Sequence, residues 1–352
     1  MIDTDAKLAA FLPALQAAPW LSLDTEADSL HAYPEKICLI QISTPAGDRL
    51  IDPLAKITLA PLLEALANHV LIMHGADYDL RLLRKHHEFA PSGIFDTMLA
   101  ARLLGERQFG LGSLAEKFLG VKLDKGPQKA DWARRPLTPR MESYARHDTH
   151  HLKPLADNLN SALKAKGRLR WHEESCARLI VECSRPSRVD EDCVWRVKGS
   201  SRLSRPALAV LRQLWHWREH EAVAANRPPF FILNHDKLAA ISAAAAAHHS
   251  LEPLLPPRIS HRRRESLLEA VKAGLAVPPA QQPEILRQRF ERPNEAERRR
   301  YAELARRRDA HAHRLGIDPT LIASKATLGE LARSWERHAP ELMNWQRELL
   351  AA

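Results

Sequence analysis

The most informative stretch of this sequence is residues 20–26, Trp20-Leu21-Ser22-Leu23-Asp24-Thr25-Glu26, which reads as a short strand that runs out into acidic residues. Side chains alternate between the two faces of a strand, so Asp24 and Glu26 leave the same face at its end. The sequence therefore predicts that two carboxylates point to one place beside this strand.

Two further β-rich runs follow, at residues 37–43 and 49–53, and the turn residues Pro45-Ala46-Gly47-Asp48 between them suit a hairpin. Three strands in succession predict an antiparallel meander. The third run is interrupted by Pro53, which cannot donate a backbone hydrogen bond to a neighbouring strand.

The next segments alternate between helix and strand. Residues 59–68 and 77–88 have helical spacing, and the apolar run at 70–75 between them reads as a buried strand that ends at Gly75. Residues 97–165 read as almost all helix. The first part of the chain is therefore predicted to be an α/β domain, a mixed sheet flanked by helices.

The second half of the chain has a different pattern. Residues 184–206 contain the Pro, Gly and Ser clusters of a linker, and beyond them the one β-rich run is the brief Phe230-Phe231-Ile232. Proline pairs then divide a helical stretch into pieces. Two small helical modules are expected here.

Length and composition limit the class of protein to which this chain can belong. The chain has 352 residues, 45% of them hydrophobic and 27% charged, which suits two or three domains with their own cores. The four cysteines include no C-x-x-C pair and are expected to be reduced and buried. The acidic start Met1–Asp5 differs from a secretory signal, and no apolar stretch is long enough to cross a membrane, so we expect a cytoplasmic protein.

The net charge of +9 is unevenly distributed, with +2 in residues 1–170 and +7 in residues 171–352. A local basic excess suits a polyanionic partner, because each Lys or Arg that replaces a counterion on a phosphate gains free energy. A solvated basic face is the alternative, and the runs Arg298–Arg300 and Arg306–Arg308 leave both open.

Further candidate site residues follow the acidic strand. Asp79 opens the helix after the fourth strand, and Tyr144 and Asp148, four residues apart on a predicted helix, share one face. Each has an ordinary explanation alone, as a turn cap, a first-turn carboxylate or a core aromatic. As a set they are hard to assign to caps and core.

This set resembles the three motifs of the DEDD 3′-to-5′ exonucleases: Asp24-Thr25-Glu26, His74-x-x-x-Tyr78-Asp79 and Tyr144-x-x-x-Asp148. Tyr144 is typical of the tyrosine subclass. The sister subclass has a histidine five residues before the last aspartate, where this chain has Ser143.

The likeness is closest to the ribonuclease D family, to which Ile51–Leu54, Asp96-Thr97, the segment Asp131–Leu137 and Trp195–Gly199 are also similar. Residues 203–275 resemble its HRDC module, a small helical domain shared with RecQ-type helicases, although Ser260–Glu265 is more basic than the usual pattern. The resemblance implies a ribonuclease H-like sheet and four parts: a DEDD exonuclease domain at 1–170, a helix and linker at 171–200, an HRDC domain at 201–280 and a second HRDC-like domain at 285–352.

The resemblance also implies two divalent cations, Mg²⁺ or Mn²⁺, held by four carboxylates. Asp24 would bridge both ions, Glu26 and Asp148 would complete the site nearer the attacking water, and Asp79 would support the other ion. Tyr144 would orient the water, because a phenol with a pKa of about 10 is a poor base at neutral pH.

Four residues are weaker candidates for contact with the substrate. They are His74, Gln128, Lys129 and Trp132. His74 at a strand end could equally be a structural hydrogen-bond donor, and Trp132 could be core packing.

The predicted function is that of a 3′-to-5′ exoribonuclease that releases 5′-nucleoside monophosphates from structured RNA such as tRNA precursors, as a monomer without a membrane partner. The +7 half would hold the RNA, and the chemistry would survive removal of residues 200–352. A DNA exonuclease of the proofreading or RecQ-associated type is one alternative. A catalytically inactive RNA-binding scaffold is another, which the five filled catalytic positions disfavour.

Overall fold

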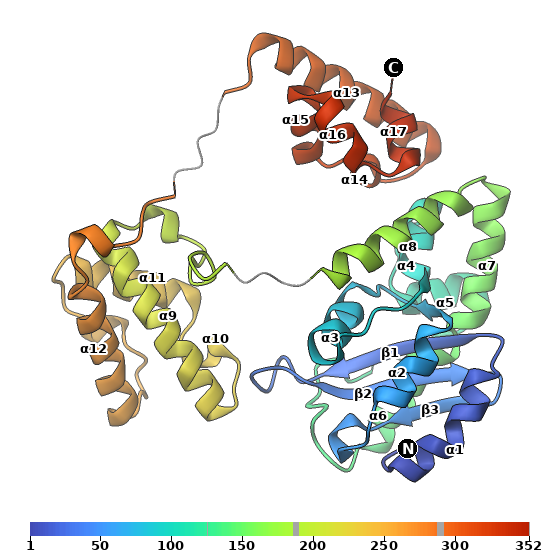
Figure 1. The fold of residues 1–352 in the computed structure, drawn as a ribbon, viewed down its shortest axis with the longest axis horizontal. Helices are drawn as coiled ribbons and strands as arrows, with labels where there is room; N and C mark the ends of the chain where they lie inside the picture. Colours follow the sequence, from blue (N-terminus) through green and yellow to red (C-terminus); the bar gives the residue numbers. More distant parts are fainter. Residues whose placement is uncertain (125, 186–189, 287–291, 352) are drawn as a thin grey trace. The chain divides into compact units, whose positions relative to one another are not determined.

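The acidic strand lies at the centre of a five-stranded sheet (Figure 1). The structure is a computed structural model that describes residues 1–124, 126–185, 190–286 and 292–351. The strand order is β3-β2-β1-β4-β5, with β1 antiparallel to β2, β2 antiparallel to β3, and β4 parallel to both β1 and β5. The strands are β1 (Leu21–Ala27), β2 (Ile37–Thr44), β3 (Gly47–Ile51), β4 (Val70–Met73) and β5 (Gly93–Asp96). The predicted α/β class and the antiparallel meander are confirmed.

The sequence prediction missed β5. This strand, Gly93-Ile94-Phe95-Asp96, has only two apolar residues between a glycine and an aspartate, so it lacks the continuous apolar run that marked the equally short β4. Its pairing with β4 is parallel, a contact that depends on the intervening helix α3 (Asp77–His87). Nearest-neighbour patterns in the sequence do not report such a contact.

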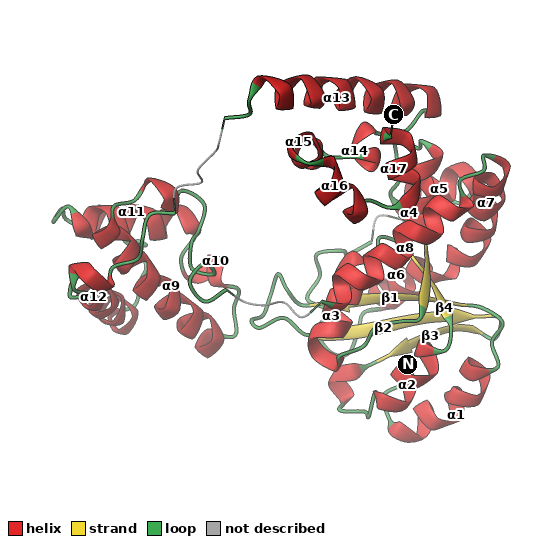
Figure 2. Ribbon diagram, turned by 45° about the horizontal axis from the view of Figure 1, so that its top comes forward, coloured by secondary structure: helices red, strands yellow, loops and turns green. Residues whose placement is uncertain are grey.

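Helices cover both faces of the sheet (Figure 2). One face, with Leu21 and Leu23 of β1, packs against α1 (Asp5–Gln16), α2 (Ala60–Ala67), α3 and α8 (Leu169–Ser184). The other face packs against α6 (Pro139–His150) and α7 (Leu152–Ala165). Because β1 alternates, Ser22, Asp24 and Glu26 belong to the α6 face.

The chain forms two compact units, and the last helices belong to the same unit as the sheet. The core that they share contains residues of α4 (Thr97–Leu104), α5 (Leu111–Leu119) and α7 together with residues of the C-terminal helices. Those C-terminal elements are α13 (Glu295–Leu315), α14 (Pro319–Ile322), α15 (Lys325–Arg333), α16 (Trp335–His338), the 3₁₀ helix η5 (Ala339–Glu341) and α17 (Asn344–Leu350).

The second unit comprises residues 28–36 and 190–286. It is helical, and its core includes Trp195 and Val197 from the segment predicted as linker. The run Phe230-Phe231-Ile232 is not a strand, because Pro229 begins a short helix there. Its elements are η2 (Ser200–Arg202), α9 (Arg205–Ala225), α10 (Pro229–Ile232), α11 (His235–Ala246), η3 (Glu252–Leu254), α12 (His261–Leu275) and η4 (Pro279–Gln281).

Two predictions from composition can be compared with the structure. Cys38, Cys176 and Cys183 are buried as expected, whereas Cys193 is exposed, which corrects the prediction for that residue. In the described ranges, no helix is both long enough and apolar enough to cross a membrane.

A glycine permits the closest helix crossing in the second unit. A Cβ atom at Gly274 of α12 would lie 2.5 Å from Cα of Val210 in α9, whereas one at Gly112 of α5 would meet nothing within 4 Å. We expect Gly274→Ala to destabilise the protein by about 1–3 kcal/mol through overpacking. Gly112→Ala should be neutral or stabilising, since alanine favours a helix over glycine.

Thermal unfolding followed by circular dichroism would measure both variants. A lower midpoint for Gly274→Ala only is the expected result. Equal midpoints for the two variants would contradict the close crossing of α9 and α12.

Candidate active site

Three carboxylates converge between β1 and α6. Asp24 lies in the middle of β1, Glu26 lies next to its last residue, and Asp148 lies on α6. One oxygen of each carboxylate lies within 4.8 Å of one oxygen of each of the other two. The structure therefore brings together three of the four carboxylates that the sequence singled out.

Buried hydroxyl groups fix α6 against the sheet beside these carboxylates. The Ser22 hydroxyl donates to the backbone oxygen of Thr149 at 2.9 Å, and the Ser43 and Thr149 hydroxyls lie 2.7 Å apart. Thr149 follows Asp148 directly. The contacts with β1 and β2 therefore set the position of the helical turn that carries Asp148.

Asp79, the fourth carboxylate, is held by the residue between the two β1 carboxylates. Its Oδ1 accepts a hydrogen bond from the Thr25 backbone N–H at 3.1 Å and from the Thr25 hydroxyl at 2.5 Å. Thr25 points away from the α6 face, toward α3, because of the alternation in β1. One strand thus presents Asp24 and Glu26 on one side and holds Asp79 through the other.

Burial raises the pKa of all four carboxyl groups, and repulsion from neighbouring carboxylates, Asp96 in the case of Asp79, adds to it. Burial is the main cause for each. The pKa of Glu26 rises to about 9, of Asp148 to about 7 and of Asp79 to about 6, and the pKa of Asp24 rises well above its usual range. Asp79 adds repulsion to the other three carboxyls. Such a cluster favours either protons or cations.

Tyr144 stays protonated beside this cluster. Burial first, then the charges of Asp148 and Glu26, raise its pKa far above the ordinary value. Its hydroxyl is hydrogen-bonded to the Asp148 carboxylate, which requires the phenol to be the donor, and also to the Gln128 side chain. Tyr144 can therefore act as a hydrogen-bond donor, and it is a poor general base.

The four predicted substrate contacts have different surroundings. Gln128 and Lys129 are exposed, and Gln128 reaches Tyr144. His74 is half-buried, with Nδ1 2.8 Å from the Thr97 hydroxyl, which agrees with a structural role.

Trp132 has the surroundings of its alternative role, core packing. It is only 1% exposed and packs with Leu39, Leu50 and Met141, so no face of its ring is open to a nucleotide. Its ring lies 6.1 Å from that of Tyr144, between centroids. Trp132 supports Tyr144 from the core.

The chain is similar to known exonucleases. Residues 1–164 match a family model described as 3′-5′ exonuclease, and residues 207–248 match the HRDC domain. A ribonuclease D from Gluconacetobacter diazotrophicus is 31% identical over 99% of this chain and 89% of its own length. The chain belongs to the ribonuclease D family. A second member, from Pseudomonas paraeruginosa, is 29% identical over 99% of this chain and 94% of its own.

Solved structures agree with this assignment. Escherichia coli RNase D, described as an exoribonuclease involved in structured RNA processing, is 26% identical with a TM-score of 0.77, over 100% of this chain and 96% of its own. The catalytic core of RRP6 from Trypanosoma brucei is 27% identical with a TM-score of 0.66, over 78% of this chain and 77% of its own. The predicted family and enzyme class, a 3′-to-5′ exoribonuclease, are confirmed.

In this ribonuclease D family member, Asp96 organises the turn before Asp79, a role that the sequence did not reveal. Its carboxylate accepts hydrogen bonds from the backbone N–H groups of Gly75 and Ala76, at 3.1 and 2.8 Å, and caps the start of α4. An aspartate before an apolar helical run is the usual signal of an N-cap, but its contact with the earlier turn depends on the pairing of β4 with β5.

A bidentate ion pair holds the loop that contains Gln128 and Trp132. The Arg135 guanidinium donates to both oxygens of Asp52, at 2.5 and 2.6 Å, and to the backbone oxygens of Cys38 and Trp132 at 2.7 and 2.8 Å. The sequence had marked Asp52 and Arg135 as similar to ribonuclease D family segments without giving them a role. Their pairing fixes the loop to β2 and β3.

The raised pKa values predict a pH dependence of stability in the absence of divalent cations. Unfolded carboxyls ionise near pH 4, whereas in the folded protein these groups keep their protons to higher pH, up to about 9 for Glu26. The folded state binds more protons in that window, so the free energy of unfolding should fall as the pH rises from about 4 to 9. Divalent cations should restore the free energy of unfolding most at high pH.

The measurement is the thermal midpoint of chelator-treated protein at several pH values, with and without Mg²⁺. The gain from Mg²⁺ should be much smaller in Asp24→Asn than in Asp157→Asn, a control whose exposed carboxylate pairs with Lys153 on α7. Equal gains in the two variants would argue against cation binding by the cluster.

Gly126 leaves room for the Tyr144 ring. A Cβ atom at position 126 would lie 1.6 Å from Cδ2 of Tyr144, so a side chain there must displace the ring. We expect Gly126→Ala to reduce nucleotide release by about 10²-fold, the effect of a misplacement of about 1 Å.

Release of mononucleotides from a 3′-labelled RNA measures this effect, with Tyr144→Phe as the reference. Gly110→Ala is the control, because a Cβ there meets nothing within 4 Å. Wild-type release by Gly126→Ala would show that the ring position does not matter.

Proposed function

We propose that Asp24, Glu26, Asp79 and Asp148 hold two divalent cations, Mg²⁺ or Mn²⁺, with which this chain hydrolyses phosphodiester bonds at RNA 3′ ends. The observation that carries the proposal is the convergence of three carboxylates within 4.8 Å, each with a raised pKa. Such a cluster is unfavourable without positive charge.

The donor set fits hard cations. All four side chains offer carboxylate oxygens, the ligands that Mg²⁺ and Mn²⁺ prefer over nitrogen or sulfur. Four carboxylates nearly balance two dications. Asp24, which all three other carboxylates repel, would be shared between the two ions, and Asp79, held by Thr25, would serve the ion away from Asp148.

When bound, the cations supply an acidified water and positive charge for the phosphate oxygens. In hydrolysis, a water oxygen bonds to phosphorus while the bond to the 3′ oxygen of the preceding nucleotide breaks, which yields a 5′-monophosphate and a new 3′-hydroxyl. The side chains of the protein contribute by positioning the attacking water. The Tyr144 hydroxyl keeps its proton and donates it to Asp148, which fixes the hydroxyl, and a lone pair of its oxygen would accept a hydrogen bond from the water and so orient it.

RNA is the proposed substrate because the family acts on it. E. coli RNase D is described as processing structured RNA, and we infer a related substrate here, such as the 3′ ends of tRNA precursors. Gln128 and Lys129, exposed on the loop beside Tyr144, would contact the terminal nucleotide, and His74 would support the site from the β4 end.

The domain boundaries inferred from the sequence, at 1–170, 171–200, 201–280 and 285–352, are part of the proposal. The HRDC match at residues 207–248 falls inside the third of these parts, and residues 186–189 and 287–291 lie outside the described residues. We further propose that the protein is a cytoplasmic monomer.

Substitution of Asp148 tests the assignment. Asp148→Asn keeps the size of the side chain but removes a charge from the cluster, and we expect nucleotide release to fall by at least about 10³-fold while RNA affinity changes little. Asp157→Asn, on the exposed face of α7, should release nucleotides at the wild-type rate.

The assay uses matched RNA and DNA strands with 3′-extended ends, resolved on gels as a stepwise ladder, with affinity measured separately by filter binding. Equal decay of DNA would favour a DNA exonuclease. Wild-type release by Asp148→Asn would remove this cluster as the active site.

A further inference from the structure

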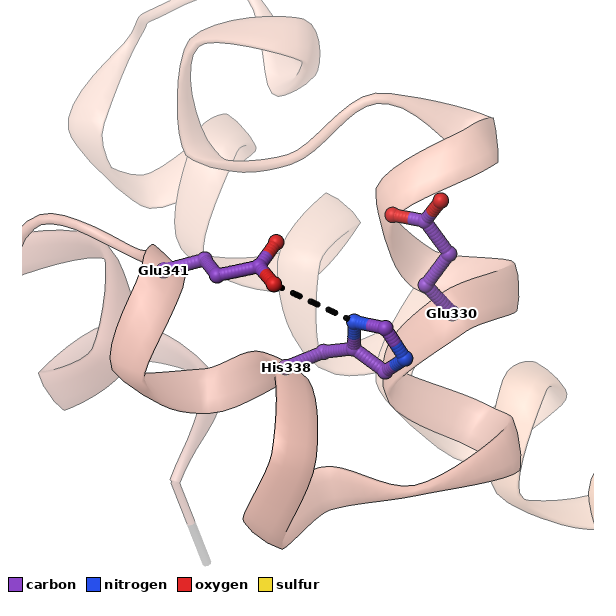
Figure 3. Close-up of side chains that lie close together, drawn as sticks. All are labelled: Glu330, His338 and Glu341. Carbon is purple, nitrogen blue, oxygen red and sulfur yellow. Dashed lines mark ion pairs between the residues drawn. The ribbon is translucent and has the colours of Figure 1, made fainter.

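A second set of metal-ligating side chains lies in the C-terminal helices. Glu330 on α15, His338 on α16 and Glu341 on η5 converge, with one ligand atom from each within 4.8 Å of those of the other two (Figure 3). We infer that these three residues bind a divalent cation of the zinc class. The site shares no residue with the proposed exonuclease centre.

The spacing of His338 and Glu341 suits a shared cation better than a direct bond. His338 Nδ1 lies 3.6 Å from Oε1 of Glu341, which is too long for an N–H···O hydrogen bond of about 2.7–3.2 Å. Two ligands that each lie about 2.0–2.2 Å from a tetrahedral zinc ion are separated by roughly 3.4 Å. The observed separation is close to this value.

The Nδ1 atom of His338 is buried and has no hydrogen-bond partner among the described residues. A buried polar atom without a partner loses its hydrogen bonds to water and gains none in return, so native proteins seldom leave one unsatisfied. In Figure 3 this nitrogen faces the Glu341 carboxylate across a gap. A cation in that gap would satisfy the nitrogen lone pair and both carboxylates together.

The backbone around the three ligands is well fixed, although two of the side chains can move. Leu328 and Leu331 anchor α15 in the core, and the buried Ala339 anchors η5. The Arg178 guanidinium of α8 donates to the backbone oxygen of Glu341 at 2.5 Å. Glu330 and Glu341 are exposed, so rotation of their side chains can bring the carboxylate oxygens to coordination distance.

The local charge favours a cation. Two carboxylates flank one imidazole, and the Arg178 guanidinium, which donates to the Glu341 backbone oxygen, is compensated by Glu182, with Nε 2.7 Å from Oε1. The same residues line a cavity of about 590 Å³, in which a water molecule could complete the coordination sphere.

The donor set distinguishes this site from the carboxylate cluster of β1 and α6. An imidazole nitrogen favours Zn²⁺, Co²⁺ or Ni²⁺, whereas Mg²⁺ keeps to oxygen ligands. The cation would join α15 to the segment formed by α16 and η5, so its effect would be structural.

Calorimetric titration of the full chain with ZnCl₂ tests the inference, with excess Mg²⁺ present to occupy the carboxylate cluster. We expect one tight equivalent whose affinity falls at least tenfold in His338→Ala and in Glu330→Gln. Glu336→Gln is the matched control, because Glu336 is an exposed glutamate of α16 outside the set. Its affinity should equal that of the wild type.

Two further readouts keep the test decisive. Co²⁺ substitution should give the visible absorption of a four-coordinate ion, which Glu330→Gln should lose. Circular dichroism checks that the variants fold. If His338→Ala does not fold, Glu330→Gln still tests the site, because position 330 is exposed. Absence of a tight equivalent, or a tight equivalent unchanged in Glu330→Gln, would overturn the inference and leave His338 and Glu341 as a simple ion pair.

Discussion

The repulsion among the carboxylates of β1 and α6 is the constraint on which the surrounding structure depends. Without cations, Asp24, Glu26 and Asp148 destabilise one another, so they stay together only because other contacts hold the elements that carry them. Those contacts are buried hydrogen bonds from hydroxyl groups: serine hydroxyls of β1 and β2 meet Thr149 on α6, and the Thr25 hydroxyl binds Asp79. The hydrogen bonds of the folded scaffold thus place the charges in advance, and cations need only neutralise them.

The basic residues of the second half are used differently from what net charge alone suggested. Arg262 and Arg263 of α12 both donate to the Glu221 carboxylate. In the run of arginines at 306–308, Arg308 is buried and donates to the backbone oxygen of Ala323, and Arg307 donates to that of Leu350. Many of these charges therefore stabilise helix packing. The net surplus alone therefore does not say which side chains are accessible: Arg308 is buried, whereas Arg299, which pairs with Glu295, is largely exposed.

The sequence was a good guide where a pattern is local and a poor one where a role depends on distant pairing. β-rich and apolar runs bounded by turn residues predicted β1 to β4, and the spacing of Tyr144 and Asp148 placed both on one face of a helix. The roles of Asp96 and Arg135 could not be predicted, since their partners at Gly75 and Asp52 are brought near by the sheet. Trp132 was ambiguous for a related reason. An aromatic residue in a loop is compatible with stacking or with burial, and only the packing against Leu39 and Met141 decides between them.

The packing of the C-terminal helices changes how the catalytic part of the chain is defined. The sequence suggested that the chemistry would survive removal of residues 200–352, yet Leu304, Ile322 and Leu328 share a core with Leu103 and Leu155. The buried Arg168 donates to the backbone oxygens of both Leu103 and Leu315, each at 2.7 Å, and a Cβ atom at Gly105 would lie 2.1 Å from the backbone oxygen of Gly316. Removal of the tail would expose this apolar surface and leave the Arg168 charge partly unpaired. The stable catalytic body therefore includes residues 292–351, although none of them belongs to the carboxylate cluster, and a shortened exonuclease that keeps them while replacing residues 190–286 with a flexible linker is the better-founded minimal form.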